Sequence, residues 1–372
     1  MLISDSTKCI FRGIGEIMLA SNGYTGLFFL VGLYYENSIM ATVALSCTII
    51  STLTAVIFKF NKDNIMEGLY GFNSSLIGCA MVFYLELNIY VVIGFIIGSI
   101  VSTLIMEFFL RNNLPAYTFP FIFTTWILLW ILRIPGITEP KAPSDTIDYK
   151  VLIDYAMPAH SFGQVLFLGD CISGLLVLIG VYIWSPIAAL YGIISTIISA
   201  GISNYFIDVN GSAVSIDRIH AGLYGFNAVL CGIAQSGKKP IDGIYVLLSL
   251  IISTTFYIML IQNSFTSLTF PFVLSMWFCC ILKFIISNYT INNNSTLEIN
   301  DSTSLCGIKQ TKIYKNFKFV LKKISKLRNR SKKQNNRKYK NSTNIDNLNN
   351  DLSDITLKNI ITNNNNILLN II

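Results

Sequence analysis

A glutamate and two copies of one hexapeptide stand inside apolar stretches of this chain. Glu16 follows the glycine-rich segment GIG, and GLYGFN occurs at 68–73 and again at 222–227. An ionisable group in a membrane segment is by default a candidate for function. We interpret Glu16 as a group that hydrogen-bonds neighbouring helices and orients acceptors for a solute. The alternative is structural: a hydrogen bond, or an ion pair with Arg12 one turn earlier.

Each hexapeptide ends in an amide, Asn73 or Asn227, which hydrocarbon rejects unless it finds partners. Its glycines, together with Pro120 and Pro271 further on, have the composition of broken helices rather than of lipid-facing ones. Irregular backbone at membrane depth is tolerated where it is buried in protein or lines a cavity. We therefore expect the two copies to line a path, with each Asn capping or cross-linking broken helices. Close helix packing by glycine is the alternative.

Six apolar runs surround these residues. Of the 372 residues, 53% are hydrophobic and only 13% are charged, against about 25% charged in soluble domains. A helix needs roughly 20 apolar residues to cross a bilayer. The sequence therefore predicts an all-α polytopic membrane protein. The runs are Ser38–Phe58, Leu87–Met106, Ala116–Leu132, Pro186–Ile207, Ile244–Ile261 and Phe265–Leu282.

The second half of the chain repeats the first. Four blocks recur in order at nearly constant offsets: GIGEIML and SFGQVLF at 148, GLFFLVG and GLLVLIG at 148, GLYGFNSSLIG and GLYGFNAVLCG at 154, and TFPFIFTTW and TFPFVLSMW at 151. One matching block could arise by chance, whereas an ordered series indicates an internal duplication.

Composition divides the chain into four regions. They are a first transmembrane repeat (1–133), a Pro-rich linker (134–160), a second repeat (161–287) and an Asn- and Lys-rich tail (288–372) expected to be disordered. Because cytoplasmic segments near membrane spans are rich in Lys and Arg, we place the tail inside and the linker outside. The second repeat then has an odd number of crossings, which predicts an inverted repeat with its solute site near the membrane midplane.

These blocks resemble the urea transporter family. The resemblance rests on GxGE at 13–16, the doubled GLYGFN blocks, and LPAYTFPF with its following TW at 114–126 and a second copy at 269–277; it covers residues 10–287. It implies a homotrimer in the cell membrane, with one pore per protomer, ten spans in two five-span halves, two re-entrant pore half-helices, and passive, channel-like flow of urea.

The resemblance also implies which residues form the pore. Phe72 with Leu76, and Phe226 with Leu230, match a slot-forming pair in each half, and Thr118 and Thr269 match a central pair of hydroxyls. The remaining matches open the two pore half-helices and are Glu16, Ile17, Leu19, Gln164, Val165 and Phe167. Leu19 departs from the pattern, which has an aromatic there, and Glu16 and Gln164 look exchanged between the halves.

Two other functions stay open at this point. A proton- or ion-coupled transporter of small amides would use membrane acids such as Glu67, Glu86, Glu107 or Asp170, for which solvated or structural roles are the alternative. A tether or nucleic-acid-binding membrane protein driven by the tail would depend on residues 290–372. The bases of the tail would form an amphipathic helix on anionic lipid, for which a disordered, solvated tail is the alternative. The sequence predicts no enzyme and no cofactor, because it has no phosphate loop, no GxSxG, no CxxC pair among eight cysteines, and two histidines. The body, close to neutral, predicts no nucleic-acid partner.

Overall fold

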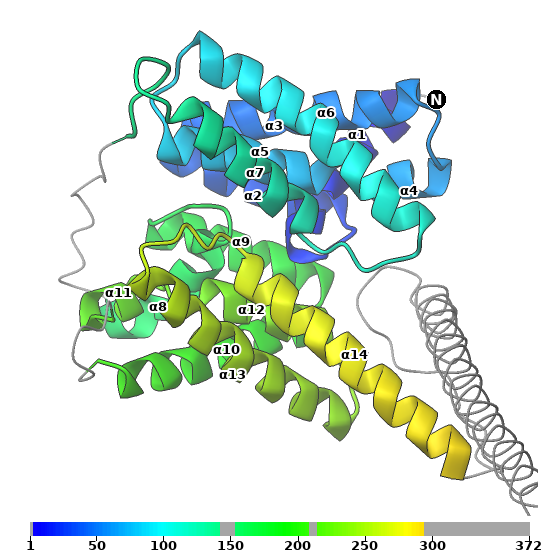
Figure 1. Cartoon of the computed structure of the whole chain (residues 1–372), viewed down its shortest axis with the longest axis vertical. Helices are drawn as coiled ribbons and strands as arrows, with labels where there is room; N and C mark the ends of the chain where they lie inside the picture. The colour runs from blue at the N-terminus through cyan, green and yellow to red at the C-terminus, as the bar shows by residue number, and fades with distance from the viewer. Residues whose placement is uncertain (1–2, 142–152, 208–213, 294–372) are drawn as a thin grey trace, which may run out of the picture. The chain divides into compact units, whose positions relative to one another are not determined.

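Helices account for nearly all regular structure in the computed structural model, which describes residues 3–141, 153–207 and 214–293. The first half contains α1 (Ile3–Gly15), η1 (Glu16–Met18), α2 (Gly23–Glu36), α3 (Ser38–Ile57), α4 (Lys62–Glu67), α5 (Gly71–Tyr84), α6 (Ile89–Arg111) and α7 (Phe119–Leu132). The second contains α8 (Ile153–Gln164), α9 (Cys171–Trp184), α10 (Pro186–Tyr205), α11 (Ile216–His220), α12 (Phe226–Gln235), α13 (Pro240–Gln262) and α14 (Phe270–Asn293). Figure 1 shows them as two neighbouring groups, blue to teal and green to yellow.

Among the described residues, four helices are long and apolar enough to cross a membrane: α3, α6, α10 and α13. A fifth candidate is the bent pair formed by 7–18 and 23–36, whose two parts meet at 75°. The prediction of an all-helical membrane protein is confirmed at this level. Two of the six predicted runs yield shorter or displaced helices, since α7 begins at Phe119 and has 14 residues, and α14 begins at Phe270.

Backbone geometry explains where α7 and α14 begin. Tyr117 and Leu268, two residues before each helix, have φ of 46° and 48°. A bulky residue in the left-handed region cannot continue a right-handed helix. Pro120 then occupies the first turn of α7, where its missing N–H leaves no intrahelical bond unmade. The apolar residues before each start therefore belong to a turn rather than to the helix.

The two halves repeat this geometry at matched positions. Among the described residues, seven other than glycine have positive φ, and six of these fall into three pairs at the offsets of the sequence repeat. The pairs are Leu19 and Phe167 (62° and 63°), Asn113 and Ser264 (53° and 55°), and Tyr117 and Leu268 (46° and 48°). Positive φ is rare for such residues, so the duplicated sequence folds into a duplicated backbone.

A buried hydroxyl network is duplicated as well. In the first half, Ser51 donates to the carbonyl of Tyr70 and lies 2.7 Å from the hydroxyl of Thr103. In the second half, Ser199 donates to the carbonyl of Tyr224 at 2.7 Å and lies 2.9 Å from the hydroxyl of Thr254. Each network joins the central long helices of its half to the backbone of GLYGFN. The hexapeptide is thereby held in one place in both halves.

Helices α2 and α9 join the two halves through close backbone contact. Gly32 of α2 faces the carbonyl of Ser173, and Gly180 of α9 faces the ring of Phe29. The hydroxyl of Thr25 donates to the carbonyl of Gly180 at 2.8 Å. Small residues that let helix backbones approach are the usual basis of helix association in membranes, and here they pack one repeat on the other.

Part of the predicted linker and most of the tail lie outside the described residues. Residues 142–152 of the linker and 294–372 of the tail are not described. The divisions at 133, 160 and 287 therefore stay predictions.

Candidate functional site

The first glycine of each GLYGFN block fits a position that no other residue could take. Gly68 and Gly222 have φ of 84° and 73° and end the short helices α4 and α11. A Cβ on either would overlap the backbone nitrogen of the facing chain, Gly13 in the first half and Ser161 in the second. Left-handed backbone and lack of space both require glycine. The blocks therefore dock on α1 and α8, the helices that lead to Glu16 and Gln164.

The Asn of each block caps a helix from another part of its half. Asn73 Oδ1 accepts a hydrogen bond from the backbone N–H of Phe121 at 3.1 Å, and Asn227 Oδ1 accepts from that of Phe272 at 3.2 Å. Both N–H groups lie in the first turn of their helices, α7 and α14, where no intrahelical partner exists. The prediction that these amides cap helices is confirmed for α7 and α14; that these helices are broken stays a prediction.

Because the Asn residues supply these caps, the hydroxyls of Thr118 and Thr269 are available to form a hydrogen bond with each other. Thr118 is the N-cap of α7, yet its side chain makes no cap hydrogen bond, because Asn73 supplies it. Thr118 Oγ1 instead lies 2.7 Å from Thr269 Oγ1, and both residues are buried, at 1% and 3% exposure. The two repeats thus meet at a hydroxyl pair between the residues that directly precede α7 and α14.

Two tryptophans make reciprocal hydrogen bonds beside this pair. Trp126 Nε1 donates to the carbonyl of Thr266 at 2.8 Å, and Trp277 Nε1 donates to the carbonyl of Pro115 at 2.9 Å. Donors and acceptors are each related by the offset of 151. The ring contacts repeat the same exchange, with Phe119 on Trp277 and Phe270 on Trp126, both at 5.3 Å between centroids. The contact between the repeats is therefore self-complementary, as at an isologous interface.

The residues around Glu16 and Gln164 lie at the ends of broken helices. The N–H of Leu19 donates to the carbonyl of Glu16 at 2.9 Å, and that of Phe167 donates to the carbonyl of Gln164 at 3.1 Å. Leu19 and Phe167 thus occupy equivalent left-handed turns despite their different side chains. A left-handed residue is a common way to end a helix. These turns leave the side chains at 16 and 164 at matched places beside the hexapeptides.

Glu16 is buried, with 3% exposure, and does not pair with Arg12. The ion pair that forms among the described residues joins Arg111 and Glu107 at 2.6 Å, whereas Arg12 donates to the carbonyl of Met66 at 3.0 Å. Ser21 lies close to Glu16, and its hydroxyl donates to the backbone carbonyl of Glu67 at 2.9 Å. Of the two structural interpretations, the ion pair with Arg12 is wrong and the hydrogen bond remains.

The structure buries most of the predicted pore residues and brings some of them together. The hydroxyls of Thr118 and Thr269 are in contact, while Phe226 packs edge-on against Tyr257 at 5.2 Å and Phe167 lies 5.2 Å from Phe83. Gln164 Nε2 donates to the carbonyl of Ala221 at 3.4 Å, from the turn before the second hexapeptide. Buried are Glu16, Ile17, Leu19, Phe72, Leu76, Thr118, Val165, Leu230 and Thr269; half-buried are Gln164, Phe167 and Phe226.

Two of the four acids considered for coupling, Glu107 and Asp170, have structural partners. Tyr70 donates to Glu107 at 2.5 Å, and the same carboxylate pairs with Arg111. Asp170 caps α9 by accepting from the backbone N–H of Ile172 at 2.7 Å. Among the described residues, no three His, Cys, Asp or Glu side chains lie close enough to hold a metal ion.

Sequence reasoning missed three features of this region. Trp126 and Trp277 were aligned within the repeated blocks but given no role. The hydroxyl networks of Ser51 and Ser199 were not considered, and Glu36 was not singled out. Glu36 accepts from the backbone N–H of Gly169 at 2.7 Å and from the hydroxyl of Ser173 at 2.5 Å, and so ties α2 to the start of α9. Matching every residue to its partner 148–154 positions away would have found the first two, while Glu36 has no acidic counterpart.

Comparison with known proteins agrees with this arrangement. A family model described as urea transporter matches residues 7–284. Similar relatives include urea transporter 1 of Ovis aries, 26% identical over 253 residues, and urea transporter 1 of Rattus norvegicus, 25% identical over the same length. Each alignment covers 61% of this chain and 62% of the relative, so the chain spans less than two thirds of their length. Because the family match covers the two repeats with their paired Asn, Thr and Trp residues, the chain belongs to the urea transporter family.

Proposed function

We propose that this protein is a passive channel for urea across the cell membrane. The observation that carries the proposal is the hydroxyl pair of Thr118 and Thr269, buried where the two repeats meet and 2.7 Å apart. Each hydroxyl is released from capping its own helix by an Asn from the hexapeptide of its half. Polar side chains that face the interior of a membrane protein mark solute pathways.

Urea requires such oxygens because it is a flat, neutral molecule with four N–H donors around one carbonyl. Burying an amide without partners costs roughly 2–7 kcal/mol, so an apolar hole would exclude it. The hydroxyls of Thr118 and Thr269 exchange their mutual hydrogen bond for bonds to the passing solute. The carboxyl of Glu16 and the amide of Gln164, at the ends of α1–η1 and α8, extend the row of acceptors. Weak binding at several sites permits rapid passage.

The helices that meet at the two threonines favour a neutral solute over a cation. Thr118 stands before the first residue of α7 and Thr269 before that of α14. A helix N-terminus carries roughly half a positive charge, and two of them converge here. Positive ends of half-helices exclude cations in this way in other channels.

Apolar side chains provide the walls of the proposed slot. Phe72 with Leu76, and Phe226 with Leu230, stand one helical turn apart on α5 and α12, so each pair faces the same side. Ile17, Leu19, Val165 and Phe167 complete the two mouths. Leu19 in place of an aromatic makes the first mouth wider than the second.

The matched geometry of the two halves supports an inverted repeat of two five-span halves, with α1–η1 and α8 as re-entrant pore half-helices. Self-exchanging contacts such as those of Trp126 and Trp277 are what a pseudo-two-fold relation generates. In inverted repeats the solute site lies at the interface of the repeats, where the threonine pair is found. The same proposal includes a homotrimer with one pore per protomer and a cytoplasmic C-terminal tail.

Stopped-flow measurement of urea flux tests the function. The full chain is reconstituted in liposomes, and urea efflux is compared with and without an imposed pH gradient. A channel gives flux that is unaltered by the gradient and never concentrates urea. Accumulation of urea driven by the gradient would establish the proton-coupled alternative instead.

Glu16→Ala tests the role of the buried carboxyl in the same assay. We expect urea flux to fall to the level of empty liposomes while the protein still elutes as one assembled species. Near-normal flux would remove Glu16 from the site.

A further inference from the structure

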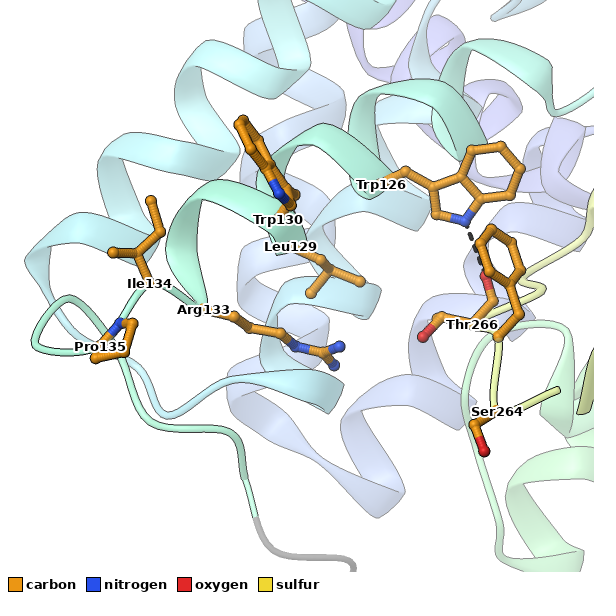
Figure 2. A pocket seen from close by; sticks show the side chains of 9 residues that line it. Trp126, Leu129, Trp130, Arg133, Ile134, Pro135, Ser264 and Thr266 are labelled. Atoms are coloured by element: carbon orange, nitrogen blue, oxygen red, sulfur yellow. Dashed lines mark hydrogen bonds between the residues drawn. The ribbon is translucent and has the colours of Figure 1, made fainter.

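A groove opens beside the contact between the repeats, away from the proposed slot. It has a volume of about 630 Å³ and lies between the second half of α7 and the segment 264–266 that precedes α14. Figure 2 shows Leu129 and Arg133 on one side and Ser264 and Thr266 on the other, with the Arg133 side chain reaching into the gap between them. Trp126 closes one end through its hydrogen bond to Thr266.

The groove combines apolar walls with one exposed cation. Leu129, Ile134 and Phe265 line it, and Trp130 at its rim is 76% exposed. Arg133 is exposed and lies over the ring of Tyr84, 5.6 Å from its centroid. No acid within the described residues forms an ion pair with Arg133. Its guanidinium therefore keeps its fork of N–H donors for an anion from outside.

The position of Arg133 fits the headgroup level of a membrane. It is the C-cap of α7, directly after an apolar helix of 14 residues. Tryptophans such as Trp130 gather where hydrocarbon meets water, and arginines near helix ends reach the same level. Arginine binds phosphate in a bidentate manner that lysine cannot reproduce.

The second repeat provides an internal comparison. At the offset of 151, Arg133 corresponds to Phe284, Trp130 to Ile281, and Thr266 to Pro115. At these positions the second repeat has neither the arginine nor the exposed indole, although Lys283 stands one residue away, with its Nζ 4.4 Å from the centroid of the Tyr245 ring. Because the second repeat has the same backbone without equivalents of Arg133 and Trp130, the shared fold does not require these two residues. The groove is therefore a feature of the first repeat and not of the duplicated fold.

We propose that this groove binds an anionic phospholipid of the surrounding bilayer. The phosphate pairs with Arg133, and an acyl chain lies along Leu129 and Phe265. Through Trp126 and Thr266 the lipid joins α7 to the segment that leads to Thr269, so its binding stabilises the contact between the repeats. The proposal depends on the membrane location of the chain and not on urea as its solute.

Thermal unfolding with added lipid tests this site. The purified full chain in an uncharged detergent is titrated with phosphatidylglycerol or with phosphatidylcholine carrying the same acyl chains. We expect phosphatidylglycerol to raise the unfolding temperature more than phosphatidylcholine. A basic group near the membrane surface contributes about 1 kcal/mol to binding an anionic lipid, so Arg133→Gln is expected to weaken the apparent affinity for phosphatidylglycerol about fivefold. Arg133→Lys should retain part of the preference.

Lys141→Gln is the matched control, because it removes an exposed positive charge eight residues further on that does not line the groove. It should leave the preference unchanged. An equal loss in Lys141→Gln and Arg133→Gln would overturn the proposal in favour of unspecific surface charge. A change of oligomer size in Arg133→Gln would overturn it in favour of a second copy of the chain in the groove. Equal effects of the two lipids on the unmodified chain would overturn it outright.

Discussion

Asn73→Ala removes the side chain that caps α7 from outside. The substitution leaves the buried N–H of Phe121 without the oxygen now 3.1 Å away. Thr118, one turn earlier at the N-cap, carries a hydroxyl that reaches this N–H in ordinary capped helices. We therefore expect the Thr118 hydroxyl to accept a hydrogen bond from the N–H of Phe121 and to lose its hydrogen bond to Thr269. The variant should remain folded but lose the hydroxyl pair between the repeats.

The magnitude follows from two opposing terms. Loss of the cap leaves one buried N–H unsatisfied, which costs about 1–3 kcal/mol. Capture of the Thr118 hydroxyl recovers part of this, while the lost bond to Thr269 adds about 0.6 kcal/mol, the average for such bonds in membrane proteins. We expect Asn73→Ala to reduce the free energy of unfolding by about 1–2 kcal/mol.

A double-mutant cycle with Thr118→Val measures the exchange directly. Val has nearly the shape of Thr without its hydroxyl, so in Asn73→Ala/Thr118→Val no side chain can cap α7. The double variant should lose about 1 kcal/mol more than the sum of the single variants. The assay is reversible unfolding of the purified protein in mixed detergent, followed by its tryptophan fluorescence. Asn227→Ala with Thr269→Val repeats the cycle in the second half, where the same bond measures 3.2 Å.

Urea flux gives a second readout of the same exchange. Asn73→Ala should slow flux although the changed side chain does not line the proposed slot. Additive energies in both cycles would refute the idea that the two Asn residues release the threonines. Unchanged flux in a variant that loses the predicted stability would refute the role of the hydroxyl pair in passage.

Three further experiments, two of which compare a pair of substitutions, test separate parts of the structure. Gly222→Ala places a Cβ against the backbone of α8 at a φ of 73° and should prevent assembly, whereas Gly243→Ala, with nothing within 4 Å, should leave the elution profile unchanged. Leu19→Phe should keep the fold, because φ at this position matches that of the aromatic in the other repeat, and should lower thiourea flux more than urea flux; equal reduction of both would contradict a role in selectivity. Glu107→Gln retains an acceptor for Tyr70 and should reduce the free energy of unfolding by under about 1 kcal/mol. Glu107→Leu leaves the Tyr70 phenol without that acceptor and should reduce it by about 1–3 kcal/mol. Thermal unfolding that ranks the two variants in reverse order would show that the charge of Glu107 matters more than its hydrogen bond to Tyr70.

The duplicated architecture was predictable because the repeated blocks carry its special positions. The paired glycines at 68 and 222 were visible as letters, and the structure shows the left-handed backbone that they permit. The helix starts at 119 and 270 were not, since Tyr117 and Leu268 take left-handed φ against their own preferences. Tertiary packing imposes that geometry, and an apolar run contains no trace of it.

The end of α6 shows a second limit of sequence reasoning. The apolar run was expected to stop at Met106, before a glutamate, but the helix continues to Arg111. Glu107 remains within it because Tyr70 and Arg111 satisfy its carboxylate. One partner is a single turn away in sequence and the other comes from a different element. Only the first could be inferred from spacing.

Of the site itself, the resemblance supplied the threonine pair, whereas the reason that the pair is free lay in Asn73 and Asn227. Spacing could indicate that these amides join helices, but not which N–H groups they reach. The acceptors of Trp126 and Trp277 were equally hidden, because both are backbone carbonyls.

Those carbonyl acceptors have a consequence for how the two halves can change over time. A main-chain oxygen is present whatever residue carries it, and the positions that receive the indoles are already occupied by such different residues as Pro115 and Thr266. Mutations in either loop therefore leave the anchor of the opposite half intact. The two copies can therefore diverge in sequence, and acquire features that only one of them has, while the hydrogen bonds that hold them together are kept.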